Sequence, residues 1–220
     1  QNAAPIDCTT GTMYCVFDYN GGGSDWRRFP TLGERFDRLT EQLEIITGLW
    51  GTPAGETFDY SGTHYSVSES PGLPKPAQTP HPPIILGGMG AKRTPALTAR
   101  FATEFNIPFA PLDGLIQQYA RVAAAVEEAG RAKDSLTYSA AFVLCAGRDD
   151  AEIARRAAAI GREVDELRSN SPAVGTPDEI VDKLGPFLQG GVQRVYLQVL
   201  DMSDLEHIEF IAETVVPQLR

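Results

Sequence analysis

The sequence has few cysteines and no long apolar run. Its three cysteines, Cys8, Cys15 and Cys145, are an odd number, and no two have the spacing of a zinc site or a redox motif. This pattern disfavours a structural metal and a disulfide framework. No segment approaches the roughly 18 consecutive apolar residues of a membrane helix, and the first residues lack the basic and apolar regions of a secretory leader. We therefore expect a soluble, cytoplasmic protein that binds no metal and no membrane.

Basic residues are also scarce. The chain has 19 Lys and Arg against 29 Asp and Glu, a formal charge of -10. Polyanionic partners favour clustered Lys and Arg, so this balance argues against a nucleic-acid partner. The three histidines, His64, His81 and His207, have no second ligand at helical spacing, and we expect them to be structural or exposed. Cys145 ends the apolar run Ala140 to Ala146, which predicts a small buried hydrophobe in preference to a reactive thiol.

The length of 220 residues and the hydrophobic content of 42% fit one globular domain. An amphipathic helix is predicted from about residue 34, because apolar residues recur there at three- and four-residue steps: Phe36, Leu39, Leu43, Ile46 and Trp50. Two short β-type runs at 57–60 and 64–67 predict a hairpin. The proline-rich stretch at 71–83 suits an extended path. It is expected to belong to a single fold in preference to an interdomain linker.

Beyond residue 83 the pattern alternates between strand and helix. Strands are predicted at 84–87, 103–107, 137–145 and 192–199, and the helices between them near 93–102, 115–126, 150–168 and after Thr176. Strands separated by helices of this length predict βαβ units and a parallel sheet. A closed barrel of eight such units needs about 250 residues. The sequence therefore predicts about four βα units.

Two helix starts are expected from capping chemistry. In Thr176-Pro177-Asp178-Glu179 a threonine caps, a proline takes the first helical position and a glutamate reaches back from the third. Ser203-Asp204-Leu205-Glu206 repeats this box. Pro95 requires its helix to start shortly before it, and Gly185-Pro186 predicts a kink in the helix after Thr176.

Four segments in order resemble the luciferase-like monooxygenase family, most closely its branch that uses the deazaflavin coenzyme F420. The segments are Gly33 to Leu39, Pro71 to Pro76 running into Pro82 to Gly88, Gly175 to Ile180, and Gly190 to Val195. The resemblance covers about residues 30 to 219. It implies an α/β fold, the carboxy-terminal part of a luciferase-like (β/α)₈ TIM barrel, with a hairpin and proline-rich loop at residues 51–83. That loop would cover the barrel mouth, or else serve only as packing decoration.

The amino-terminal strands of such a barrel are expected to be missing. In this family the first four strands precede the segment matched by Gly33 to Leu39, whereas residues 1–29 do not match the pattern and offer one candidate strand, Met13 to Tyr19. Catalytic residues therefore cannot be carried over and are unknown. The resemblance implies an oxidoreductase that uses coenzyme F420, or FMN as the alternative, for hydride transfer or monooxygenation of a small-molecule substrate. The alternative function is a non-catalytic remnant that binds a phosphorylated ligand or forms subunit contacts.

Active sites of such barrels lie at the carboxy ends of the strands. Here these ends are 87–90, 106–108, 147–148 and 200–201, and the first is the candidate cofactor site. Glycines after a strand allow a ligand to approach the backbone, and the following helix offers amides and a positive dipole end to a phosphate. The predicted cofactor-binding residues, by resemblance at the coenzyme's phosphate, are Gly87, Gly88, Met89, Gly90, Arg93 and Thr94. A plain tight βα turn is the alternative.

An incomplete barrel leaves strand edges without partners. Ile84 to Leu86 would lose a neighbour on one side, and Val192 to Leu200 would lose the strand against which it closes. Inward-facing apolar side chains would also lose the layers that pack on them. We therefore expect a homo-oligomer or poor solubility, unless Met13 to Tyr19 pairs beside Ile84.

Overall fold

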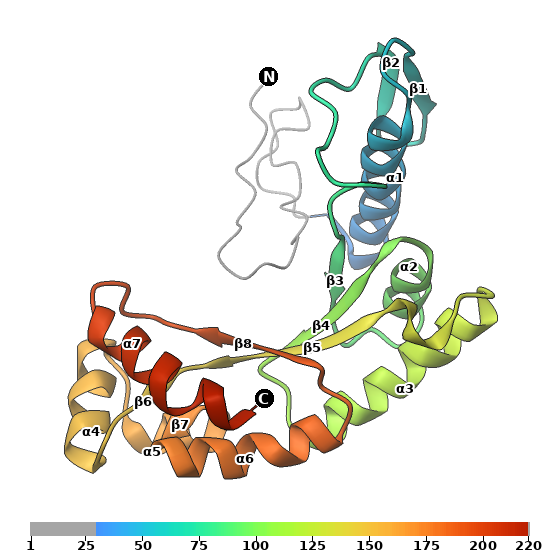
Figure 1. Cartoon of the computed structure of the whole chain (residues 1–220). Coiled ribbons are helices and arrows are strands. Elements are labelled where there is room, and N and C mark those ends of the chain that lie inside the picture. Colours follow the sequence, from blue (N-terminus) through green and yellow to red (C-terminus); the bar gives the residue numbers. More distant parts are fainter. Residues whose placement is uncertain (1–29, 220) are drawn as a thin grey trace.

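A parallel sheet of four strands forms the centre of the molecule. The computed structural model describes residues 30–219, and Figure 1 traces the chain. The strand order is β3 (Ile85–Gly87), β4 (Glu104–Pro108), β5 (Thr137–Val143) and β8 (Arg194–Gln198), and all neighbours pair in parallel. The parallel sheet and the four predicted strands are confirmed. The candidate strand Met13 to Tyr19 lies outside the described residues.

Helices cover one face of this sheet. They are α2 (Arg93–Phe101), α3 (Leu112–Glu128), α6 (Pro177–Gln189) and α7 (Leu205–Thr214) (Figure 1). Alternate side chains of the strands, such as Phe105, Ile107 and Phe142, pack in one core with Leu115 of α3 and Leu184 of α6. Burial of these apolar side chains at the strand–helix interface is the main force that holds the layers together.

The other face of the sheet carries polar side chains of β4 and β8 beside Ala141 and Val143 of β5, so the expected inward-facing apolar side chains make up only part of it. Nδ2 of Asn106 donates to Oγ of Ser139 at 3.0 Å. Glu104 accepts from the guanidinium of Arg194 and, at 2.8 Å, from the hydroxyl of Tyr196, so that β4 and β8 are joined across β5. These hydrogen bonds and the ion pair offset the cost of burying the polar groups, although the buried Oδ1 of Asn106 has no partner among the described residues.

The strand predicted at 137–145 is broken at Leu144. The N–H of Leu144 donates to the carbonyl of Gln198 in β8, but the N–H of Cys145 donates to the carbonyl of Ala173. The chain thus changes partners, and β6 (Cys145–Ala146) pairs with β7 (Val174–Gly175) in a separate two-stranded sheet. The hydrophobic run was continuous, so the sequence pattern did not mark the change.

The helix predicted at 150–168 is two helices, α4 (Asp150–Ala159) and α5 (Val164–Asn170). Gly161 has φ +66°, a left-handed conformation that ends the first helix, and the N–H of Arg162 bonds back to the carbonyl of Ala157. The prediction of one helix was wrong because it did not take Gly161 as the end of a helix.

The first capping box is confirmed and the second is wrong. Thr176 caps α6, with Glu179 reaching back to the N–H of Thr176 at 2.8 Å. At α7 the N-cap is Asp204, whose carboxylate accepts the N–H of His207, whereas Ser203 donates to Asp201. Pro95 is the third residue of α2, as its missing N–H requires. α6 is assigned without interruption through Pro186, so the kink stays a prediction.

The predicted first helix and hairpin are present. α1 (Leu32–Gly51) precedes the antiparallel hairpin of β1 (Phe58–Ser61) and β2 (Ser66–Ser70), and Figure 1 shows both standing apart from α6 and α7. Residues 71–83 form no helix or strand, and the proposed lid role of residues 51–83 stays a prediction. Two short 3₁₀ helices, η1 (Lys133–Ser135) and η2 (Val216–Leu219), complete the described elements.

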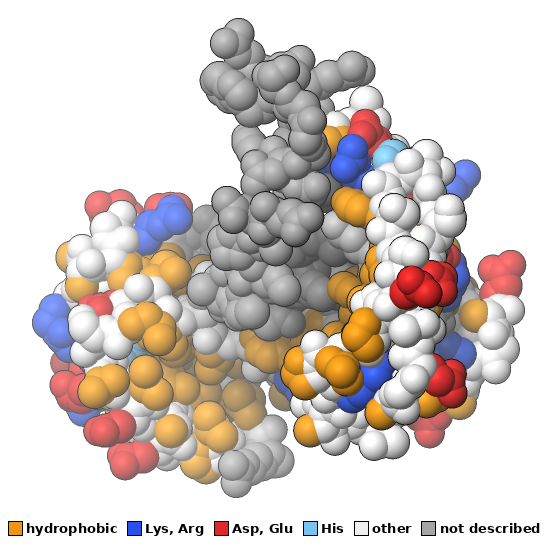
Figure 2. Space-filling model, turned by 90° about the horizontal axis from the view of Figure 1, so that it is seen from above, with side chains coloured by type: hydrophobic (Ala, Val, Ile, Leu, Met, Phe, Trp, Pro, Cys, Tyr) orange, Lys and Arg blue, Asp and Glu red, His pale blue; other side chains and the backbone are white. Residues whose placement is uncertain are grey.

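Charged side chains of both signs lie on the surface. On the face shown in Figure 2, Lys and Arg side chains are scattered among acidic and apolar ones. Among the helices of residues 30–219, none combines the length and the apolar character that crossing a membrane requires.

Candidate functional site

The loop Gly87–Gly90, here called the glycine loop, needs glycine at two positions for different reasons. Gly88 has φ +127°, a backbone conformation that L side chains rarely adopt. A Cβ added at Gly90 would lie only 2.6 Å from Oγ1 of Thr94. The loop therefore passes close over the start of α2, as a tight turn at the carboxy end of β3 requires.

A buried glutamine fixes this loop. Gln118 of α3 is fully buried, and its Nε2 donates to the carbonyl oxygens of Gly88 at 3.2 Å and Gly90 at 2.9 Å. Its Oε1 accepts from Arg121 at 3.1 Å. Because the amide is satisfied at both ends, it holds the two carbonyls in place and makes the loop rigid before any ligand arrives.

The structure separates the predicted site residues into two groups. Gly87 to Gly90 and the buried Thr94 meet at the start of α2, whose N-cap Lys92 makes no side-chain capping bond and whose first turn has no acidic residue. Arg93 turns instead towards α1, where it pairs with Asp37 and donates to the carbonyl of Gly33 at 3.0 Å. Its charge is already matched within the protein. The cofactor role of the whole set stays a prediction.

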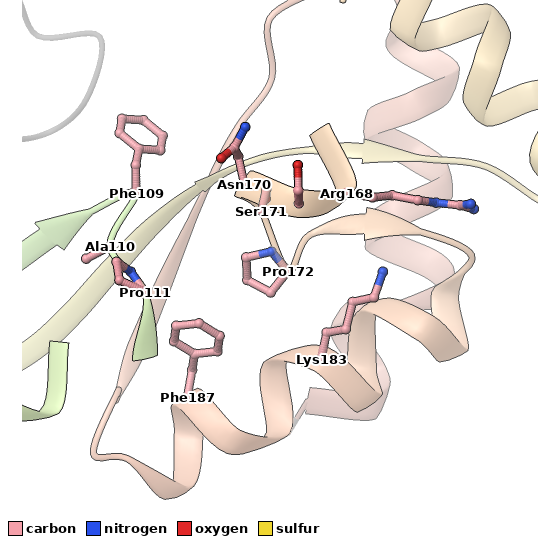
Figure 3. Close-up of a pocket in the computed structure, with 10 residues that line it drawn as sticks. Phe109, Ala110, Pro111, Arg168, Asn170, Ser171, Pro172, Lys183 and Phe187 are labelled. Carbon is pink, nitrogen blue, oxygen red and sulfur yellow. The ribbon is translucent and has the colours of Figure 1, made fainter. Parts of the chain in front are cut away.

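A pocket of about 570 Å³ lies at the carboxy end of β4, and Figure 3 shows it in close-up. We call it the β4 pocket. Its lining comes from the β4–α3 loop, α5, the segment before β7, and α6: Phe109, Ala110, Pro111, Arg168, Ser169, Asn170, Ser171, Pro172, Lys183 and Phe187. It adjoins the glycine loop, because a Cβ at Gly114 would lie 3.6 Å from Cε of Met89 and 3.8 Å from Cγ of Pro111.

Lys183 is the cation best placed to meet a ligand in the β4 pocket. Its Nζ donates to the carbonyl of Val174 at 2.9 Å, which uses one of its three donors. Arg168 leads away from the centre of the pocket in Figure 3 and pairs with Asp150 at 2.7 Å. The hydrogen bond that Arg168 donates to Asp150 raises the pKa of Arg168 despite the opposing effect of desolvation. The buried Nε of Arg168 has no hydrogen-bond partner among the described residues.

The apolar part of the pocket is aromatic. Phe187 packs edge-to-face on Phe142 of β5, with ring centroids 4.9 Å apart, so its position is fixed by the core. Phe109 is 48% exposed and has φ +54°, and its N–H donates to the carbonyl of Ala141 at 2.9 Å. A cavity of this size with aromatic walls and a cation suits an organic ligand that carries a negative charge.

Cys145 and His207 form structural contacts. Cys145 is 1% exposed and burial raises the pKa of its thiol, which confirms a small buried hydrophobe. His207 is buried and bonded to the backbone, which confirms a structural histidine. Within residues 30–219, no cluster of three or more His, Cys, Asp or Glu side chains is arranged to hold a metal ion.

Sequence reasoning named the glycine loop but missed Gln118, Phe109 and Lys183. Each lies on a different element, and the local sequence around each looks like an ordinary helix or loop. The one available signal was position, because Phe109 directly follows a strand whose carboxy end was expected to face the site.

Comparison with known proteins gives consistent matches. The family model described as luciferase-like monooxygenase matches residues 18–173. An F420-dependent glucose-6-phosphate dehydrogenase of Microbacterium testaceum is 40% identical over 83 residues, which are 38% of this chain and 22% of that protein. The structure of an F420-dependent secondary alcohol dehydrogenase in complex with an F420-acetone adduct superposes with a TM-score of 0.73 at 16% identity, covering 88% of this chain.

A third relative carries a different coenzyme. The oxygenating constituent of 3,6-diketocamphane monooxygenase from Pseudomonas putida, in complex with FMN, superposes with a TM-score of 0.60 at 17% identity over 86% of this chain. The chain spans 64% of the length of each of these two structures. At such identities the likeness establishes the fold, and the four βα units described above correspond to part of a luciferase-like (β/α)₈ barrel.

Proposed function

Since the chain belongs to the luciferase-like monooxygenase family, we propose that it acts as an oxidoreductase on a small organic molecule with a deazaflavin or flavin coenzyme. Coenzyme F420 is the first choice, because the dehydrogenase relative is F420-dependent by name. FMN is the alternative, because a structural neighbour was solved with it. Both coenzymes join a planar ring to a phosphate through a short polyol chain.

The observation that carries this proposal is the β4 pocket beside the glycine loop. Its volume of about 570 Å³ lies within the range of small-molecule and cofactor sites. Lys183 supplies a positive charge, Phe109 and Phe187 supply apolar walls, and Gln118 keeps the adjoining glycine loop in place. A ligand with one anionic end and one planar end matches this distribution.

Each residue of the site would contribute binding or orientation. Lys183 would hold the phosphate at one end of the pocket, and the glycine loop, which adjoins the pocket near Pro111, would contact the rest of the ligand through its backbone. The aromatic walls would exclude water from the planar end. When bound, the coenzyme would supply hydride transfer or, for a flavin, the activation of molecular oxygen.

Titration of the purified protein with F420 and with FMN, followed by coenzyme fluorescence, tests the proposal. Lys183→Met should weaken binding of the preferred coenzyme about tenfold or more, since a charge-assisted hydrogen bond is lost. Lys133→Met is the matched control, because Lys133 is exposed in η1 and lies outside the pocket lining. Saturation by neither coenzyme at millimolar concentration would refute the proposal.

A second candidate is a protein that binds the phosphorylated ligand without turning it over. The observation in its favour is that the described sheet has four strands with two open edges, β3 and β8. Single-turnover mixing of the coenzyme complex with alcohols, aldehydes and sugar phosphates separates the two candidates. Tight coenzyme binding with an unchanged coenzyme spectrum throughout the panel would favour the binding protein.

A further inference from the structure

Phe109 adopts a backbone conformation that its side chain disfavours. Its φ of +54° lies in the left-handed region, which glycine and asparagine enter readily and bulky residues rarely do. The backbone turns there from β4 towards α3, and the N–H of Phe109 bonds to the carbonyl of Ala141. A glycine would make the same turn and the same hydrogen bond with less strain. The turn therefore does not explain the phenylalanine.

Packing does not explain it either. The ring is 48% exposed and belongs to neither of the apolar clusters that form the core of residues 30–219. An exposed aromatic side chain held in a disfavoured conformation is a combination found at ligand-binding sites, where strain is retained because the ligand contact compensates for it.

The position of the ring supplies the third observation. Phe109 stands at one end of the β4 pocket and Lys183 at the other, with Pro172 and Phe187 between them (Figure 3). The pocket is thus aromatic at one end and cationic at the other. It fits a ligand whose planar ring and anionic group are separated by a linker.

We propose that Phe109 is the stacking platform for the planar ring of a heteroaromatic ligand whose anionic group lies at Lys183. This inference rests on the proposed function, because it assigns the ring contact of the same pocket. Phe109 binds through the face of its ring and takes no part in proton transfer. Its ring lies exposed at the edge of the pocket, where a ligand can reach it.

Riboflavin and FMN separate the ring contact from the phosphate contact, because they share the ring and differ by the phosphate. Phe109→Ala and Phe109→Gly should each weaken binding of both ligands by the same factor, about threefold to tenfold, which is the usual value of an aromatic contact. Lys183→Met should weaken FMN and leave riboflavin unchanged. Phe109→Trp should retain affinity and quench the flavin fluorescence, because indole is a quencher at stacking distance.

Thermal unfolding distinguishes a binding role from a structural one. Phe109→Gly should unfold at the same temperature as the wild type or higher, since strain is relieved, and Phe109→Ala should not exceed it. Leu73→Ala, which removes another exposed apolar side chain outside the pocket, is the control and should leave both affinities unchanged. Wild-type affinity in Phe109→Ala and Phe109→Gly, or a large loss of stability in both, would overturn this inference alone. If the wild type bound none of FMN, riboflavin and F420, the proposed function would be overturned as well.

Discussion

Nε2 of His207 accepts a hydrogen bond from the backbone N–H of Ala146 at 3.0 Å. A ring nitrogen accepts a hydrogen bond only when it carries no proton, so the ring must be neutral. The hydrogen bond joins α7 to β6. Burial lowers the pKa of His207, and the nearby charge of Arg156 lowers it further, against the opposite effects of Asp204 and Glu152. The contact therefore holds only while the ring is neutral.

Stability should fall when the pH is lowered below about 6.5, the ordinary pKa of histidine. The folded pKa lies below the unfolded one, so between the two values the unfolded chain binds more protons and acid favours unfolding. Calorimetric melting temperatures between pH 7.5 and 5.5 measure this. His207→Gln supplies an acceptor oxygen that does not titrate, and it should show a smaller decline. Equal declines in both proteins would assign the effect to the carboxylates.

Much of the fold could be predicted because caps and apolar periodicity depend on residues that are close together in the sequence. The capping box at Thr176 and the apolar period of α1 each involve residues within a few turns, and both are confirmed. Local reading failed where tertiary partners decide. β5 ends at Val143, because Cys145 finds a partner in the segment before β7. Asp204 displaces Ser203 as the cap of α7, and its carboxylate also pairs with Arg156 at 2.9 Å.

The candidate site was harder to predict than the fold. The glycine loop is contiguous in sequence, so its glycines could be named in advance. Lys183, Phe109 and Gln118 come from three different elements, and only folding places them around one cavity and its neighbouring loop. Arg93 is the opposite case. It lies close to the glycine loop in sequence, but its side chain turns away from the loop and pairs with Asp37 of α1.

Removing the carboxylate of Glu41 should release the hairpin from α1. Glu41 accepts the N–H groups of Thr63 at 2.8 Å, His64 at 2.9 Å and Tyr65 at 2.9 Å, and these hydrogen bonds lower its pKa against the desolvation caused by burial. Glu41→Ala leaves three amides without this acceptor, at a cost of about 2 kcal/mol. Limited proteolysis should then cut within 58–70, whereas the exposed-site variant Glu56→Ala should resist like the wild type. Equal resistance in both variants would refute this anchor.

Arg194 and Glu104 should show coupling in a double-mutant cycle. Glu104 is 4% exposed, and of the two side chains that hydrogen-bond its carboxylate in this cluster only Tyr196 remains when Arg194 is replaced. Arg194→Met should therefore lower the free energy of unfolding by about 2 kcal/mol, because a buried charge loses its counterion. Glu104→Gln removes the charge, so the double variant should recover part of that loss. Strictly additive urea midpoints would show that the pair is not coupled.

Gln118 should control coenzyme affinity without touching the coenzyme. In Gln118→Leu the carbonyls of Gly88 and Gly90 lose their donor, so the glycine loop is free to move and must be ordered again on binding. We expect coenzyme affinity to fall about tenfold. Gln117→Leu, on the exposed side of the same helix, is the matched control. Unchanged affinity in a folded Gln118→Leu protein would exclude the loop from the site.

The open sheet edges predict self-association that depends on salt. β3 and β8 each have one neighbour in the described sheet, and a strand edge presents backbone groups that pair with a second chain. The net charge of -10 opposes the approach of two copies, and salt screens that repulsion. Light scattering coupled to size exclusion should therefore give a mass above that of one 23.8 kDa chain, rising between low and high salt. A monomer at both salt concentrations, with cooperative unfolding, would contradict the homo-oligomer and require that both edges be satisfied within one chain.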